Sequence, residues 1–304
     1  MMFDHLLIPL DGSKSGEVAL PFLQRLPLKV GTRIVLAQIV EPGAADPGPG
    51  FVEESLQFAE GYLRQIATTL PGDGIVVDTL VRCDRVAESL ATAAEEQGVS
   101  LILLATHGRT ASDSRPFGGV TEQLIRRSPV PILAVPSLSF AAFQRVPGPP
   151  IQTILVTTDG SDYADAVAPL AADIAVACDC SILLLEVIPP AGSEYRTSSQ
   201  EAAAEEHLER LSRVFEKRGL STECITGRGH PVGGILELVR SRNVDLIAMS
   251  THGGAQRTGT VVGSVTQAVL QQSGVPVLMT RTCPAPRRPN DRRKVVRARR
   301  GRGG

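Results

Sequence analysis

The chain has few aromatic residues and no tryptophan: Phe and Tyr together make up 4% of its 304 residues. Leu, Val, Ile and Ala must therefore fill the interior, and a hydrophobic content of 42% is enough for a core. Its five cysteines are Cys83, Cys178, Cys180, Cys224 and Cys283. Their scattered positions predict a reducing compartment without a disulfide framework. Cys178 and Cys180 lack the two-residue spacer of a redox motif, so we interpret them as a helix end followed by a strand start.

Long apolar runs are also absent. No stretch approaches the ~18 apolar residues that a membrane-spanning helix needs. The first apolar run follows no basic region and reaches Pro9 after a few residues, which does not resemble a secretory signal. We therefore expect a soluble, cytoplasmic protein.

The net charge of -1 hides an uneven distribution. Between Pro284 and Gly304, nine Lys and Arg residues accompany a single acid, Asp291, which gives this segment a charge of +8. Because the segment has few apolar residues, it cannot form a core. The composition predicts a disordered, solvated basic tail. The alternative is a functional role for the tail in binding nucleic acid or another polyanion.

What the chain does contain is a long repeat. Three segments occur twice: Leu10–Ser13 and Thr158–Ser161, Thr106–Gly108 and Thr251–Gly253, and Ser128–Leu133 and Ser273–Leu278. Their offsets of 148 and 145 residues greatly exceed the roughly 20–50 residues of a solenoid repeat. We therefore predict two tandem domains, at residues 1–137 and 152–282, with a linker at 138–151 and the tail at 283–304.

Each repeat alternates short apolar runs with longer amphipathic stretches. The runs are His5–Leu10, Arg33–Val40, Ile75–Val81, Ser100–Thr106 and Val130–Val135, then Thr153–Thr158, Ser181–Ile188, Ser221–Thr226, Asp245–Thr251 and Val275–Thr280. Phe51–Leu70, Asp84–Gln97 and Ser199–Arg218 have helical patterns. Continuously apolar runs are typical of strands buried on both faces, and the alternation predicts two doubly wound α/β domains with parallel sheets.

The polar signals fall at predicted strand ends, where ligands bind in open α/β sheets. An Asp-Gly-Ser segment follows the first strand of each repeat, and a Thr-His-Gly segment follows the fourth. Nine residues separate Gly108 from Gly118, and nine separate Gly253 from Gly263. A helical pattern begins at Gly118 and at Gly263. Because a helix N-terminus offers unpaired N–H groups and partial positive charge, this spacing predicts a phosphate site.

This order of motifs resembles the universal stress protein family. The motifs are a strand followed by Asp-Gly-Ser, then small-x-His-Gly, a nine-residue loop, Gly-Ser-Val and a final Val-Pro-Val strand. The resemblance covers roughly residues 3–136 and 152–281. It implies five-stranded parallel sheets in the order 3-2-1-4-5, helices on both faces, and ATP as ligand, with or without Mg²⁺. In the second repeat it implies a site made of Thr157, Thr158, Asp159, Val187, Met249, Ser250, Gly253, Gly263, Ser264 and Val265. In the first repeat it implies Pro9, Leu10, Asp11, Ile39, Ala105, Gly108, Gly118, Gly119 and Val120.

The two implied sites are unequal. Ser250 and Ala105 stand where the family motif has its first glycine. Gly119 replaces the serine that the second repeat keeps as Ser264, and Pro116 lies within the first nine-residue loop. We therefore expect the second repeat to be the main nucleotide site.

Other interpretations of these residues stay open. Asp11 and Asp159 also suit the capping of the following helix. His107 and His252 lack an accompanying nucleophile motif, so a structural turn is favoured over catalysis. The glycines from Gly227 to Gly233 miss the dinucleotide-binding spacing, and no Walker A lysine is present.

Together these features predict an adenine-nucleotide-binding protein with a stress or regulatory function, rather than a turnover enzyme. We expect the two repeats to pack as an internal pseudo-dimer, and a homodimer remains open. One alternative is a slow ATP hydrolase that uses bound Mg²⁺. The other is an interaction protein of the same fold whose pockets stay empty.

Overall fold

The computed structural model describes residues 3–41, 49–70, 74–108, 118–137, 150–190, 194–251 and 262–280. Most of the predicted linker and the whole basic tail lie outside these ranges, as do Pro116, His252 and Gly253. Every statement below concerns the described residues.

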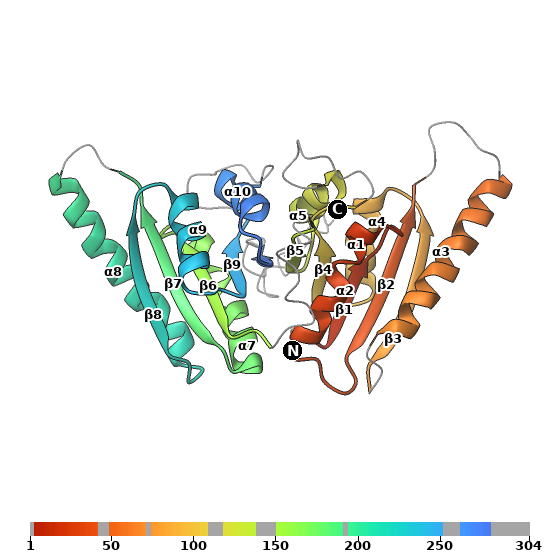
Figure 1. The fold of residues 1–304 in the computed structure, drawn as a ribbon, viewed down its shortest axis with the longest axis horizontal. Helices are drawn as coiled ribbons and strands as arrows, with labels where there is room; N and C mark the ends of the chain where they lie inside the picture. The colour runs from red at the N-terminus through yellow and green to blue at the C-terminus, as the bar shows by residue number, and fades with distance from the viewer. Residues whose placement is uncertain are drawn as a thin grey trace, which may run out of the picture.

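The first repeat alternates strands and helices (Figure 1). Its elements are β1 (His5–Pro9), α1 (Lys14–Glu17), α2 (Ala19–Phe22), the 3₁₀ helix η1 (Leu23–Arg25), β2 (Arg33–Val40), α3 (Pro49–Thr69), β3 (Val76–Cys83), α4 (Val86–Glu96), β4 (Leu101–Ala105), α5 (Gly119–Arg127) and β5 (Ile132–Val135).

The second repeat follows the same order (Figure 1). Its elements are β6 (Thr153–Thr158), α6 (Asp162–Asp165), α7 (Ala168–Cys178), β7 (Ser181–Ile188), α8 (Glu194–Glu216), β8 (Thr222–Arg228), α9 (Pro231–Ser241), β9 (Leu246–Ser250), α10 (Ser264–Gln272) and β10 (Val277–Thr280).

The strands form one ten-stranded sheet in the order β3-β2-β1-β4-β5-β10-β9-β6-β7-β8. Within each repeat the neighbouring strands are parallel, and the order is the expected 3-2-1-4-5. Between the repeats, β5 and β10 pair antiparallel, with Leu133 opposite Leu278. The last strand of each repeat would otherwise be an exposed edge, so this pairing removes an edge from both.

Helices cover both faces of the sheet, and each face has its own apolar core. On one face Phe22 of α2, Leu63 of α3 and Phe215 of α8 pack with the sheet. On the other face the contacts include Leu90 of α4 and Val269 of α10. Successive residues of a strand point to opposite faces of the sheet. Because helices cover both faces, two consecutive strand residues are both buried. The continuously apolar runs in the sequence follow from this double coverage.

Three strands have the predicted bounds: β2, β6 and β7. β5 and β10 begin two residues later than predicted, directly after Pro131 and Pro276. Proline has no N–H to donate, so the strand pairing begins beyond it. β3 and β8 extend two residues further than predicted because their partners β2 and β7 continue the ladder.

Cys178 ends α7, and Cys180 directly precedes β7, as the spacing predicted. Burial raises the pKa of the Cys178 thiol to about 11 and that of the Cys180 thiol to about 12. Both thiols therefore stay protonated at neutral pH, which does not suit redox chemistry.

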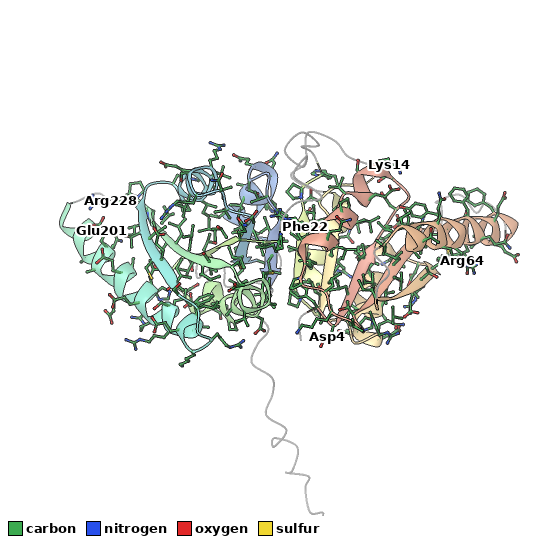
Figure 2. The ribbon with its side chains drawn as sticks, turned by 60° about the horizontal axis from the view of Figure 1, so that its bottom comes forward. Asp4, Lys14, Phe22, Arg64, Glu201 and Arg228 are labelled. Atoms are coloured by element: carbon green, nitrogen blue, oxygen red, sulfur yellow. The ribbon has the colours of Figure 1, made fainter. Side chains whose placement is uncertain are left out.

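The outer surfaces of the two long helices are charged. Figure 2 shows Arg64 on α3 at one end of the molecule, and Glu201 and Arg228 near the other end. The Arg228 guanidinium, at the end of β8, pairs with the Glu201 carboxylate on α8. Of the helices within the described residues, none is both long and apolar enough to cross a membrane.

Candidate functional site

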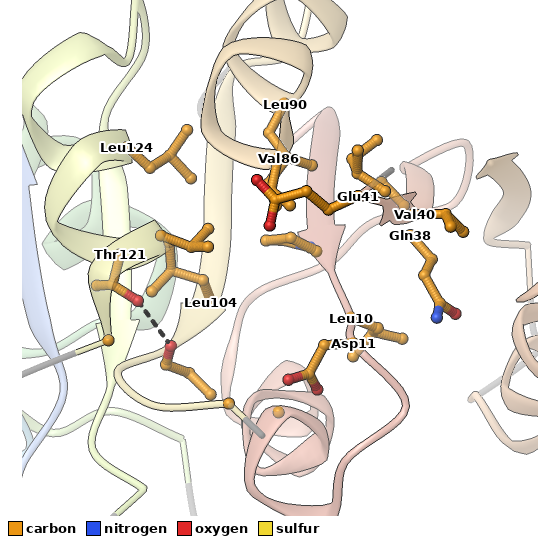
Figure 3. A pocket seen from close by; sticks show the side chains of 18 of the residues that line it. Leu10, Asp11, Gln38, Val40, Glu41, Val86, Leu90, Leu104, Thr121 and Leu124 are labelled. Atoms are coloured by element: carbon orange, nitrogen blue, oxygen red, sulfur yellow. Dashed lines mark hydrogen bonds between the residues drawn. The ribbon is translucent and has the colours of Figure 1, made fainter. Parts of the chain in front are cut away.

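Each repeat has a cavity at the carboxyl ends of its first and fourth strands. The cavity of the first repeat, the first crevice, has a volume of about 750 Å³. It is lined by all nine residues predicted for that repeat: Pro9, Leu10, Asp11, Ile39, Ala105, Gly108, Gly118, Gly119 and Val120. Figure 3 shows Leu10 and Asp11 on one side of this crevice and Thr121 and Leu124 of α5 on the other.

The second crevice, in the other repeat, has a volume of about 230 Å³. It is lined by Thr157, Thr158, Asp159, Val187, Met249, Ser250, Gly263, Ser264 and Val265, which are nine of the ten residues predicted there. The tenth, Gly253, lies outside the described residues. The structure thus brings the predicted residues together in both repeats.

The crevices lie where the strand order reverses. β1 pairs with both β2 and β4, so the loops after β1 and β4 face each other as predicted. The contact is close: a Cβ atom on Gly108 would lie 2.3 Å from Oδ2 of Asp11. A Cβ atom on Gly16 would lie 2.6 Å from the other oxygen, Oδ1. Glycine at both positions leaves room for the Asp11 carboxylate where it now lies, and a larger residue at either position would displace it.

The Asp-Gly-Ser segments form the same turn in both repeats. The N–H and hydroxyl of Ser13 donate to Asp11 Oδ1 at 3.0 and 2.6 Å, and those of Ser161 donate to Asp159 Oδ1 at 3.2 and 2.5 Å. The helix cap is the serine: Ser13 accepts from Gly16 N and Ser161 from Ala164 N. The interpretation of Asp11 and Asp159 as capping residues is therefore wrong, because the N-cap residue lies two positions later in each repeat.

The glycine loops lead to helix starts that no side chain caps. Gly118 precedes α5 and Gly263 precedes α10, and no side chain within the described ranges makes a capping hydrogen bond to either helix. The N–H of Gly118 donates to Thr106 O and that of Gly263 to Thr251 O, each at 2.9 Å. These bonds hold both helix N-termini beside the ends of β4 and β9. Uncapped N–H groups at such a position favour an anion.

His107, which follows β4 in the first repeat, is held by contacts that define the turn there. His107 is 3% exposed, and its Nδ1 lies 3.1 Å from the Thr106 hydroxyl. The backbone N–H of His107 donates to the Ser137 hydroxyl at 3.0 Å. These contacts support the predicted structural turn at His107, while His252 lies outside the described residues.

Sequence reasoning missed a polar network beside the second crevice. The Thr158 hydroxyl donates to Asp165 Oδ1 at 2.8 Å and accepts from Gly160 N at 3.1 Å. Nε2 of His207, on α8, lies 3.2 Å from the same Asp165 oxygen. Burial raises the pKa of the nearby Glu186, whose Oε2 is buried without a hydrogen-bond partner. His207 and Glu186 lie far from Thr158 and Asp165 along the chain, so no short sequence motif indicated this network.

The first repeat has a related but different arrangement. There the Tyr62 hydroxyl donates to Glu17 Oε1 at 3.3 Å. Gln38 is the sixth residue of β2, the position that Glu186 occupies in β7. Sequence reasoning also missed that α3 contributes Phe51, Glu54, Ser55 and Phe58 to the lining of the first crevice.

The two crevices differ in charge. Asp11, Glu41 and Glu54 line the first, together with no described Lys or Arg. Asp159 is the only charged residue among the described lining of the second. Nor do the described residues contain a group of three or more His, Cys, Asp or Glu side chains placed to hold a metal.

Solved structures of known proteins share this fold. A universal stress protein from Archaeoglobus fulgidus matches 92% of this chain and 99% of its own, with a TM-score of 0.71 and 20% identity. A Pseudomonas aeruginosa protein described as a universal stress protein matches 92% of this chain and 93% of its own, with a TM-score of 0.63 and 15% identity. At these identities the likeness concerns the fold alone.

Similar sequences belong to the same family. A universal stress protein of Synechocystis is 27% identical over 60% of this chain, and the match spans 58% of the relative's length. One from Mycolicibacterium smegmatis is 23% identical over 91% of this chain and 96% of its own. The model of the universal stress protein family matches residues 2–136 and again 150–281. The two matches cover most of the chain, and the chain therefore belongs to the universal stress protein family as a tandem member.

Proposed function

We propose that this chain binds adenine nucleotides, with ATP as the main ligand, and that the second crevice is the principal site. The supporting observation is the uncapped start of α10, where Ser264 lies in the same crevice as Asp159. A carboxylate accepts hydrogen bonds from ribose hydroxyls, and a helix N-terminus favours phosphate. The crevice thus offers one group for each end of a nucleotide.

The proposed pose follows the strand ends. Adenine and ribose lie against Val187 and Asp159, and the phosphates lie over the α10 start at Gly263 and Ser264. A volume of about 230 Å³ is below the roughly 300 Å³ at which ligand pockets usually begin. We therefore expect the nucleoside end to be enclosed and the phosphates to be more exposed, with any Mg²⁺ held chiefly by phosphate oxygens.

Two differences favour the second repeat over the first. Ser264 supplies a hydroxyl donor where the first repeat has Gly119. The three carboxylates of the first crevice repel a polyphosphate, whereas the described lining of the second has one. The larger volume of the first crevice is the opposing consideration.

We propose a binding module rather than a turnover enzyme. Hydrolysis needs a base that positions water, and the described lining of the second crevice has no histidine or cysteine. Single-turnover assays with labelled ATP separate the alternatives: phosphate release by the wild-type chain would favour the hydrolase. Mass spectrometry of small molecules released from freshly purified, denatured protein tests the interaction protein with empty pockets.

Calorimetric titration with ATP tests the site itself. Ser264→Ala should weaken binding by about 1–2 kcal/mol, roughly fivefold to thirtyfold, through loss of one charge-assisted hydrogen bond. Gly263→Val should weaken it further, since a side chain would crowd the phosphate and Thr251 O, which lies 3.3 Å from a Cβ at this position. Ser241→Ala, at the exposed end of α9, is the matched control. Unchanged affinity in both crevice variants would refute the assignment.

A further inference from the structure

The first crevice continues from the strand ends onto α3. We call this extension the α3 lobe and define it by Gln38, Val40, Glu41, Phe51, Glu54 and Phe58. Gln38 points to the same face of the sheet as Ile34 and Leu36, which pack on the α3 side. In Figure 3, Gln38 and Glu41 leave the end of β2 in different directions, so the cavity reaches both sides of this strand end.

Two exposed aromatic rings belong to the lobe. Phe51 is 58% exposed and Phe58 is 76% exposed. With Glu54 and Ser55 they follow the spacing i, i+3, i+4, i+7, which places all four on one side of α3. The helix is held to the sheet by other residues, including the fully buried Leu63. Neither ring belongs to the described apolar cores, and both line the cavity.

The rings are a property of the first repeat. The buried pair Ala59 and Leu63 of α3 corresponds to the buried pair Ala204 and Leu208 of α8, at an offset of 145 residues. By the same offset, Phe58 corresponds to the exposed Ala203, and Phe51 corresponds to an arginine. The second repeat therefore lacks both rings.

A buried acceptor without a partner also lines the cavity. Gln38 is 6% exposed, and its Oε1 atom is buried with no hydrogen-bond partner among the residues that the structure describes. An unpaired buried acceptor is unfavourable unless a hydrogen-bond donor reaches it. A ligand with an N–H group would supply that donor. The lobe thus has a defined preference for a hydrogen-bond donor.

The acidic residues that line the first crevice favour a positively charged ligand. Asp11, Glu41 and Glu54 are all acidic, and the described lining contains no Lys or Arg. Figure 3 shows the Glu41 carboxylate reaching over the crevice from the end of β2. Aromatic ring faces also attract cations, and aromatic residues with carboxylates are a recurring recognition set for organic ammonium groups. A polyphosphate would meet repulsion here.

We propose that the α3 lobe binds a small organic cation that has a flat aromatic body and an ammonium group with N–H donors. The aromatic body lies between Phe51 and Phe58, and the ammonium group lies among the carboxylates, within reach of the Gln38 acceptor. The two repeats then prefer different ligands: an anionic nucleotide in the second, and an aromatic ammonium compound in the first, where ATP binds more weakly.

Tryptamine is a suitable probe because the chain contains no tryptophan, so indole fluorescence reports the probe alone. Its anisotropy should rise and saturate as the full-length protein is added. Indole-3-propionate has the same ring and a side chain of similar length with a carboxylate in place of the ammonium, so it should not bind. Equal binding of both probes, or no binding of tryptamine, would overturn the proposal.

Surface variants localise the probe without threatening the fold. Phe58→Ala removes a ring that is largely exposed, and it should weaken tryptamine binding at least about threefold. Glu54→Gln should weaken it through loss of one charge. Val176→Ala is the control, since Val176 is 51% exposed on α7 of the other repeat. Tryptamine affinity that is unchanged in Phe58→Ala and Glu54→Gln would also overturn the proposal.

The same variants separate this proposal from the nucleotide site. Phe58→Ala and Glu54→Gln should leave the main calorimetric ATP step unchanged, because the second crevice is in the other repeat. Ser264→Ala should weaken ATP binding and leave tryptamine anisotropy unchanged. These measurements can therefore refute the nucleotide site in the second crevice without refuting the cation site in the α3 lobe, and the reverse also holds.

Discussion

Arg25 of the first repeat and Asp245 of the second form an ion pair that joins the two halves of the chain. Nη2 of Arg25 donates to Asp245 Oδ1 at 2.5 Å, and the guanidinium is 5.7 Å from the centre of the Phe22 ring. The other oxygen of Asp245 accepts from the N–H groups of Gln152 and Thr153 at 3.0 and 3.1 Å. One carboxylate thus ties the start of β6 to η1 of the first repeat.

Arg25→Ala should destabilise the chain strongly. Arg25 is 7% exposed, and removing one partner of a buried ion pair costs about 3–5 kcal/mol. Urea unfolding of the full-length protein measures the effect. Arg33→Ala is the control: its partner is Asp78, both side chains are about half exposed, and such pairs are worth about 0–1 kcal/mol. Equal losses in the two variants would show that the repeats do not depend on the Arg25–Asp245 contact.

The two crevices should fill with ATP at different concentrations. We expect calorimetry of the wild-type chain to show one site, or two well-separated steps with the second crevice first. Gly119→Ser supplies the missing hydroxyl in the first repeat, and no atom lies within 4 Å of a Cβ at this position. It should strengthen the weaker step about tenfold to hundredfold, the value of one hydrogen bond to a charged group. Two equal steps in the wild-type chain would contradict the predicted asymmetry.

Glu186 should make stability depend on pH. Burial raises the pKa of this carboxyl; Asp159 and Asp165 raise it further, while His207 and Arg210 oppose them. The folded state therefore binds the proton more tightly than the unfolded state. The resulting stabilisation is complete below the ordinary glutamate pKa and is lost as pH rises through the raised value. Glu186→Gln should thus stabilise the protein at neutral pH, with a difference that disappears at acid pH.

Urea unfolding at several pH values, without nucleotide, measures this difference. Glu201→Gln is the opposite control, because the hydrogen bond from Arg228 lowers the pKa of the Glu201 carboxyl. The contribution of Glu201 is present at neutral pH and is lost as pH falls through the lowered value. Parallel pH profiles for Glu186→Gln and the wild-type chain would exclude a role for Glu186 in the pH dependence.

The basic segment from Pro284 to Gly304 should bind polyanions without sequence preference. Its charge of +8 predicts that affinity falls linearly with the logarithm of salt concentration. Gel shifts with RNA and DNA compare the full chain with a variant truncated after Cys283. Loss of binding on truncation is the expected result. Equal binding by both forms, or none by either, would rule out this role.

The repeat, the approximate strand positions and the residues at the strand ends could all be predicted from the amino-acid sequence. These are local properties: an apolar run buried on both faces sets a strand, and a parallel sheet gathers the carboxyl ends of its strands at one edge. For this reason Asp11, Gly108 and Gly118 could be assigned to one crevice before their contacts were known.

Which side chains from distant elements come into contact could not be predicted from the sequence. The placement of Phe51 and Phe58 over the first crevice depends on how α3 lies across the sheet, and periodicity describes a helix face without naming what it covers. The pairing of β5 with β10 and the contact of Arg25 with Asp245 join residues far apart in the chain. Such contacts depend on the packing of whole elements, which no local pattern encodes.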